Sequence, residues 1–317
     1  MISMRHHVVS LVAVFLALAV GIVVGSGLLS GSLVSGLRDD KSEIRRELQD
    51  AEDRATRLDG QLLAADGFDA TVAPRVVRDT LADQTILVVT TPDADPADVD
   101  ALIRTVGDAG GRVTGRLALT DSFVGAAGAD QLRTTVTNVI PAGVELGTGA
   151  VDPGSLTGDL LGAVLLVDPA TGEARSTPEE RALALTTLRS GGYIGYDDAE
   201  VTPAQAALVV TGEPDPDGDA AGGNRGALVA RFAAALDTRG AGAVLAGRPG
   251  AATGNGAVAV VRADAALSSG LSTVDNLDRE AGRITTILGL REQLDGGAGR
   301  YGTGPGASAV TVGSAAR

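Results

Sequence analysis

An uncharged apolar segment near the N-terminus sets the strongest limit on how this chain folds. Residues 8–29 read VVSLVAVFLALAVGIVVGSGLL and contain no Asp, Glu, Lys or Arg. As a helix they extend about 33 Å, enough to cross a hydrocarbon core of about 30 Å. We therefore predict a transmembrane helix over Val8–Leu29. A cleaved signal peptide is the alternative, because Gly25–Gly27 offers small residues for cleavage, although signal-peptide apolar cores are usually shorter.

The residues that flank this segment bear on its orientation. Basic residues occur on both sides, with Arg5 before it and Arg38 and Lys41 after it, so the positive-inside rule gives a weak signal. The long acidic remainder favours residues 1–7 as a cytoplasmic tail and the bulk of the chain outside the cytoplasm. We expect a single-pass protein of the cell membrane. The net charge of −14 argues against a nucleic-acid partner.

Small residues recur every four positions along the predicted membrane helix. Such a stripe lets two helix backbones approach closely in lipid, so it predicts association between copies of the helix. The alternative is that Gly and Ala are simply frequent in this chain. The stripe consists of Ala13, Ala17, Gly21 and Gly25.

A heptad pattern follows over residues 37–66. Apolar positions alternate at spacings of four and three, with mostly charged or polar residues between them, which predicts a left-handed coiled-coil stalk and a homo-oligomer. A single amphipathic helix packed on the following domain is the alternative. Gly67 is expected to end the stalk. The seam comprises Leu37, Ile44, Ala51, Leu58 and Ala65 together with Lys41, Leu48, Ala55 and Leu62.

Residues 69–295 alternate strand-like and helix-like segments, which predicts a mainly parallel α/β domain. The expected strands are Thr85–Thr90, Arg112–Leu119, Ala163–Val167, Tyr193–Tyr196, Ala207–Thr211, Ala241–Ala246 and Ala257–Val261. The expected helices follow Asp95-Pro96 and Thr177-Pro178 and cover Gly226–Leu236 and Asp278–Leu294. Residues 296–317 are rich in Gly, Ala and Ser and are expected to be disordered.

Two parts of this domain echo each other. Leu87–Thr90 is followed by Pro-Asp, a helix, a Gly pair and a strand, and Leu208–Thr211 is followed by the same series. The echo suggests an ancient duplication, although two βαβ units in an Ala- and Val-rich chain would look similar.

The residue inventory restricts the chemistry of this domain. The chain has no cysteine, and beyond Val8 it has no histidine or methionine, so thiolate sites and Ser-His-Asp catalysis are excluded there. Asp215, Asp217 and Asp219 resemble the start of a calcium loop, but the expected glycine and the final glutamate are absent, so a solvated acidic loop is the better interpretation. We predict neither an enzyme nor a bound cofactor.

The two ends of the chain carry a resemblance to a known family. The opening MISMRHHVVSLVAVFLALAVGIVVGSGLLS with GLRDDK, and the late STVDNLDREAGRITTILGLREQL with GGAGRYG, resemble the actinobacterial family of mycobacterial copper transport protein B, MctB. The resemblance implies an envelope protein for copper export. Relatives called SteB imply an alternative, a non-enzymatic scaffold of cell division or cell-wall remodelling that binds a membrane partner, SteA.

The donor groups in the sequence limit how copper would be handled. Copper(I) prefers Cys and Met, and copper(II) readily accepts imidazole. Only Met1, Met4, His6 and His7 supply such groups, and the predicted topology puts them at the cytoplasmic end. His6 and His7 are therefore the weak metal-ligand candidates. We expect any copper role to be exercised through an assembly rather than by this chain as a lone channel.

Overall fold

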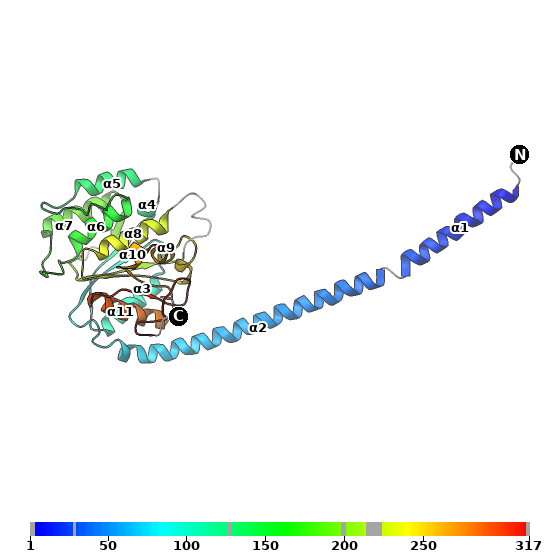
Figure 1. Ribbon diagram of the computed structural model, residues 1–317, viewed down its shortest axis with the longest axis horizontal. Helices are drawn as coiled ribbons and strands as arrows, with labels where there is room; N and C mark the ends of the chain where they lie inside the picture. Colours follow the sequence, from blue (N-terminus) through cyan, green and yellow to red (C-terminus); the bar gives the residue numbers. More distant parts are fainter. Residues whose placement is uncertain (1–3, 28–29, 126–127, 198–200, 214–223, 315–317) are drawn as a thin grey trace. The chain divides into compact units, whose positions relative to one another are not determined.

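The computed structural model describes residues 4–27, 30–125, 128–197, 201–213 and 224–314, and the chain divides into two compact units at Ala65/Asp66 (Figure 1). The first unit holds helix α1 (Met4–Gly27) and most of helix α2 (Ser30–Val76). Within α1, His6–Val24 has a mean hydropathy of 2.7 and is not buried by the chain itself. This helix is long and apolar enough to span a membrane, as the sequence predicted.

Helix α2 continues beyond the glycine that was expected to end it. It passes through Gly67 and Pro74 and ends at Val76. Glycine lowers helix propensity by only about 1 kcal/mol, so tertiary packing readily offsets it. Here Ala73 and Val77 already belong to the second unit and are buried, and Val77 is part of its apolar core, which supplies that packing. The helix therefore does not end at Gly67, whereas the coiled-coil pairing of α2 and the end of the stalk stay predictions.

The second unit contains one seven-stranded sheet in the order β3-β2-β1-β4-β5-β6-β7. Neighbouring strands are parallel except for β2 and β3, so the predicted mainly parallel α/β domain is confirmed. The strands are β1 (Thr85–Thr90), β2 (Arg112–Leu119), β3 (Ile194–Tyr196), β4 (Ala206–Thr211), β5 (Ala243–Gly247), β6 (Ser272–Val274) and β7 (Arg300–Tyr301).

Helices cover both faces of this sheet (Figure 1). Helices α3 (Pro96–Asp108) and α11 (Glu280–Leu294) pack on one face, with Val88 and Leu208 from the central strands. Alternate residues such as Leu87 and Val209 face the other side. Burial on both faces explains why these strands are continuous apolar runs. The other side carries α4 (Asp121–Val124), α5 (Ala129–Asn138), α6 (Pro153–Leu165), α7 (Pro178–Ser190), α8 (Arg225–Asp237), α9 (Ala257–Ala263), α10 (Ala265–Ser268) and the 3₁₀ helix η3 (Pro249–Ala252).

Two helices begin where their capping residues predict. Asp95 accepts a hydrogen bond from the Ala97 amide at 2.8 Å, and Pro96 occupies the first turn of α3. At α7, Thr177 and Glu180 form a reciprocal capping box. The echoing segments fold as two βαβ units, β1–α3–β2 and β4–α8–β5, with their helices on opposite faces. The duplication itself stays a prediction.

Two expected strands are helical instead. Ala163–Val167 lies mainly in α6, and Ala257–Val261 lies in α9. Helix α6 is buried all round from Gly154 to Leu165, so it lacks the polar face that marks most helices. A Cβ at Gly158 would lie 2.3 Å from the Phe232 carbonyl oxygen of α8, so this close helix packing needs glycine.

The C-terminal segment is folded rather than disordered as expected. Strand β7 pairs with β6, and Tyr301 and Ala309 are buried in the core. Gly302 adopts a φ of +127°, and a Cβ there would lie 2.2 Å from Asp275 Oδ1. The glycines therefore permit a close approach to the sheet rather than marking disorder. The last described residue of this segment is Ser314.

Candidate functional site

The two histidines proposed as metal ligands are exposed in α1. His6 and His7 are consecutive in a helix, so their side chains point in different directions. Across the described ranges, no group of three or more His, Cys, Asp or Glu side chains is arranged to hold a metal ion. Asp215, Asp217 and Asp219 lie outside the described residues. The structure thus brings together no metal centre from the predicted residues that it describes.

The small-residue stripe occupies one helix. Ala13, Ala17, Gly21 and Gly25 all fall within α1, where a four-residue spacing places them along one face. A Cβ on Gly21 would meet no atom within 4 Å, so that position is open. Association through the stripe stays a prediction.

The predicted seam also occupies one helix and is uncovered in the single chain. Ile44 is 64% exposed, and Leu48 and Leu58 are each 58% exposed. Ala51, Ala55, Leu62 and Ala65 are exposed on the same helix. Leu37 lies in α2, but its side chain is outside the description. The apolar seam therefore has no cover from its own chain at the described positions.

The carboxyl edge of the sheet is where open α/β folds usually bind ligands. Strands β1 and β4 are neighbours whose following helices pack on opposite faces, so a topological switch point lies between them. The chain fills this position itself. The hydroxyls of Thr91 and Thr211 both donate to Asp93, and a Cβ on Gly212 would lie 1.7 Å from the Asp93 carbonyl oxygen. Over the described residues, the two loops touch where a ligand would enter.

An arginine beside this point pairs with two carboxylates and feels the charge of a third, Asp278. Arg248, which follows β5, donates from Nε to Asp98 at 2.7 Å and from Nη2 to Asp95 at 2.6 Å. The hydrogen bond to Asp98 is the main reason that the pKa of Arg248 lies above its ordinary value. Burial raises the pKa of Asp278, whose Oδ1 is buried without a hydrogen-bond partner. The group holds the start of α3 against the loops after β5 and β6.

A second arginine ties the last turns of α2 to the same edge. Arg279 forms ion pairs with Asp66 and, at 3.7 Å, with Asp278. Both partners are partly buried, with 28% and 30% of their side chains exposed. This contact supports the packing that carries α2 past Gly67.

The most deeply buried ion pair anchors the C-terminal segment. The side chains of Arg262 and Asp275 are 3% and 0% exposed and are joined at 2.6 Å. Asp275 also accepts from the amides of Thr303 and Gly304 at 2.8 and 3.0 Å. Arg262 donates to the Tyr301 carbonyl at 2.7 Å. The late sequence signature and the segment after it therefore fold together around one charge pair.

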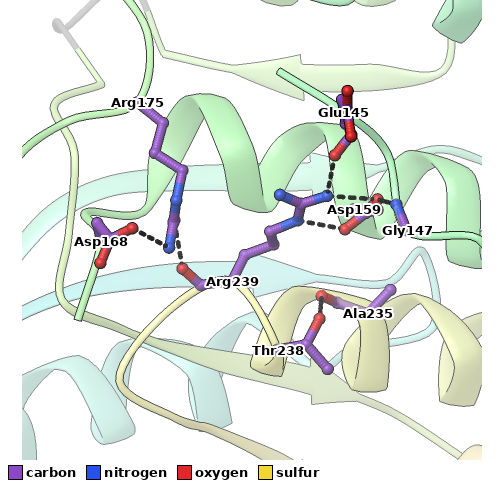
Figure 2. A network of polar contacts seen from close by, with 8 residues as sticks. All are labelled: Glu145, Gly147, Asp159, Asp168, Arg175, Ala235, Thr238 and Arg239. Carbon is purple, nitrogen blue, oxygen red and sulfur yellow. Dashed lines mark hydrogen bonds and ion pairs between the residues drawn. The ribbon is translucent and has the colours of Figure 1, made fainter. Parts of the chain in front are cut away.

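Another buried pair lies on the face of the sheet that carries α6 and α8 (Figure 2). Arg239 donates to the Asp159 carboxylate of α6 and, at 2.7 Å, to the Glu145 carbonyl, while Asp159 accepts from the Gly147 amide at 2.6 Å. The hydrogen bond to Asp159 raises the pKa of Arg239. Arg175 bridges Asp168 and the Arg239 carbonyl. All of these groups are mutually satisfied, which indicates a structural role.

These features define a class of protein: a mostly parallel α/β domain that follows an apolar helix able to span a membrane and that contains buried arginine–carboxylate pairs. Residues 1–312 match the family model described as "Copper transport outer membrane protein, MctB". The chain is 47% identical over 317 residues to the Copper transporter MctB of Mycobacterium bovis and of Mycobacterium tuberculosis, covering 98% of this chain and 99% of each relative. The Mycobacterium leprae protein of the same name is also 47% identical, over 318 residues. The chain belongs to the MctB family.

Proposed function

We propose that this chain is a membrane-anchored component of copper export that acts within an assembly. The observation that carries the proposal is the 47% identity, over 98% of the chain, with proteins named copper transporters. The family description agrees in its mention of copper transport.

The proposal assigns the chain a supporting role rather than that of the copper path. Beyond Val8 the sequence offers no Cys, His or Met, the groups that bind copper most readily. One apolar helix per chain, without a polar stripe, makes a poor route for an ion. The chain is proposed to be non-enzymatic, which the self-contact of Asp93 at the switch point supports, because it fills the usual ligand crevice.

The proposed topology is a single pass with residues 1–7 in the cytoplasm and the α/β unit outside. The net charge of −14 supports this orientation, since the anionic cytoplasmic leaflet attracts basic rather than acidic segments. The proposed attachment rests on α1, because the described sheet has helices on both faces and no lipid-facing apolar band.

Homo-oligomerisation is part of the proposal. The exposed seam of α2 and the small-residue stripe of α1 both suit a second copy of the chain, and a shared membrane would orient the copies in parallel. A SteA-like envelope protein is the proposed further partner.

A deletion strain tests the function. Loss of the gene should raise cell-associated copper and inhibit growth in copper-supplemented medium, and the full chain should restore both. A control that carries the chain with His6 and His7 changed to Ala should complement equally well if copper does not pass through them. Normal copper content and growth in the deletion strain, with abnormal division, would contradict the proposal and favour the scaffold.

A further inference from the structure

A polar cavity of about 280 Å³ lies at the amino edge of the sheet, away from the carboxyl edge described above. It is bordered by the C-terminal ends of α8 and α11 and by the segments that precede β5, β6 and β7. Several glycines line it, so backbone groups are accessible there. The lining residues that carry the argument are Asp237, Gly242, Gly270 and Gln293.

Asp237 is the only charged residue among the described residues that line this cavity. Its Oδ1 accepts from the Ala243 amide at 2.6 Å, and its Oδ2 lies 3.7 Å from the position of a Cβ on Gly270. Burial raises the pKa of Asp237 to about 7. The carboxylate is therefore held in a place that disfavours its charge.

Three other carboxylates of this unit that are mostly buried each have an arginine partner. Asp98 pairs with Arg248, and Asp275 pairs with Arg262. Asp159 is likewise paired with Arg239. Within the described part of the chain, no arginine or lysine pairs with Asp237. The cavity thus contains a carboxylate, that of Asp237, to which the described residues supply no positively charged partner.

Two further features favour a positive charge at this position. Helices α8 and α11 both end here, and the C-terminal end of a helix carries a partial negative charge. The Gln293 Nε2 donates to the Gly270 carbonyl at 2.7 Å and to Ser272 Oγ at 2.9 Å. Its Oε1 lies 3.3 Å from the position of a Cβ on Gly242, and no described residue donates a hydrogen bond to it.

We propose that this cavity binds a cationic N–H donor, an ammonium or guanidinium group, with Asp237 as its counter-ion and Gln293 Oε1 as a second acceptor. A metal ion matches the cavity less well, because a single carboxylate and an amide provide few charged ligands. The volume accommodates either a small amine or one arginine side chain from another protein. The proposal is independent of the copper role.

Calorimetric titration of the full-length protein in detergent tests the proposal with two probes. One is n-butylguanidinium, and the other is a Gly-Arg-Gly tripeptide with blocked ends. Asp237→Asn keeps an acceptor for the Ala243 amide but removes the charge, and it should weaken binding about tenfold or more. Asp108→Asn is the matched control, because Asp108 ends α3 as Asp237 ends α8, and it is exposed. It should leave binding unchanged.

The pH dependence provides a second readout. Binding should strengthen about tenfold between pH 6 and pH 8 as Asp237 ionises, and Asp237→Asn should remove that dependence. The nearby charges are already engaged: Arg239 with Asp159, Asp295 with Arg291, and Glu292 with the Tyr301 hydroxyl. Binding of both probes supports a site for a protein side chain, and binding of butylguanidinium alone supports a small amine. Absence of binding, or equal binding by the Asp237→Asn variant, would overturn the proposal.

Discussion

The two compact units differ in the exposure of their apolar side chains, which are largely exposed in the first unit and largely buried in the second. In the unit up to Ala65, Val12 is 58% exposed and Phe15 is 63% exposed. In the unit from Asp66, the side chains of Leu87 and Val209 are both 0% exposed. The second unit covers its apolar surface with its own sheet and helices, so it has what it needs to fold alone. The first unit leaves its apolar side chains uncovered, and we infer lipid around α1 and another helix beside α2.

Removal of the anchor is the largest test of this difference. A chain that begins at Arg38 should lose membrane attachment completely, because no other described helix is long and apolar enough to span a bilayer. Its α/β unit should melt within about 2 °C of the full-length value, since none of its core is deleted. Membrane fractionation and thermal unfolding followed by circular dichroism measure the two outcomes.

The N-terminus of the mature protein provides the matching control. Mass spectrometry should find it at or near Met1. A terminus between Ser26 and Ser32 would mean that the apolar segment is cleaved, and the anchor model would then be wrong.

The next largest effect is expected inside the self-sufficient unit. Asp275→Ala leaves Arg262 as an unpaired charge in the core, and it should lower the free energy of unfolding by about 3–5 kcal/mol. Asp295→Ala removes only an exposed partner of Arg291 and should cost less than about 1 kcal/mol. Urea denaturation of both variants checks the prediction. Equal losses would show that the segment around Tyr301 is not held by the buried pair.

A charge on the seam of α2 should separate the copies without disturbing the second unit. Leu48→Asp and Leu58→Asp each place a costly charge where another helix would pack, so the dissociation constant should rise about a hundredfold. Leu63 is 69% exposed and lies off the seam, so Leu63→Asp is the matched control and should stay oligomeric. Analytical ultracentrifugation of the fragment from Arg38 gives the result. A wild-type fragment that is monomeric at high concentration would remove the main support for the coiled coil.

The sequence allowed the central part of the fold to be predicted because its signals are local. Strand β1 is a short apolar run beside a capped helix, and α3 and α7 begin with Asp-Pro and Thr-Pro. The runs 163–167 and 257–261 were misassigned because a short apolar run fits a buried helix as well as a buried strand. The C-terminal segment was misassigned because glycine composition alone does not distinguish a disordered tail from a close approach such as that of Gly302 to Asp275.

The charged groups of the candidate sites were less accessible to sequence reasoning. Arg248 and Asp98 are 150 positions apart, and Arg239 and Asp159 are 80 apart, so neither pair leaves a local pattern. Asp237 is harder still to find from the sequence, because what sets it apart is the absence of a positively charged partner among the described residues. The absence of Cys, His and Met beyond Val8, by contrast, is evident directly from the sequence. It limits the chemistry of the α/β unit more than any single contact does.

Asp237 is the exception within the self-sufficient unit, and its pH dependence gives the smallest expected effect. Its pKa of about 7 in the folded chain lies above the unfolded value of about 3.9, so the folded state keeps a proton that the unfolded state releases. The free energy of unfolding should therefore fall as the pH rises from about 4 to about 7. The full shift corresponds to about 4 kcal/mol, which we reduce to ~1–2 kcal/mol because the carboxyl partly faces water. Asp237→Asn should flatten this decline, whereas Asp108→Asn should preserve it. Urea denaturation at a series of pH values measures the free energy of unfolding of the three proteins. If this free energy depends on pH in the same way for the wild type and the Asp237→Asn variant, the carboxyl is ordinarily solvated and its cavity does not favour a cation.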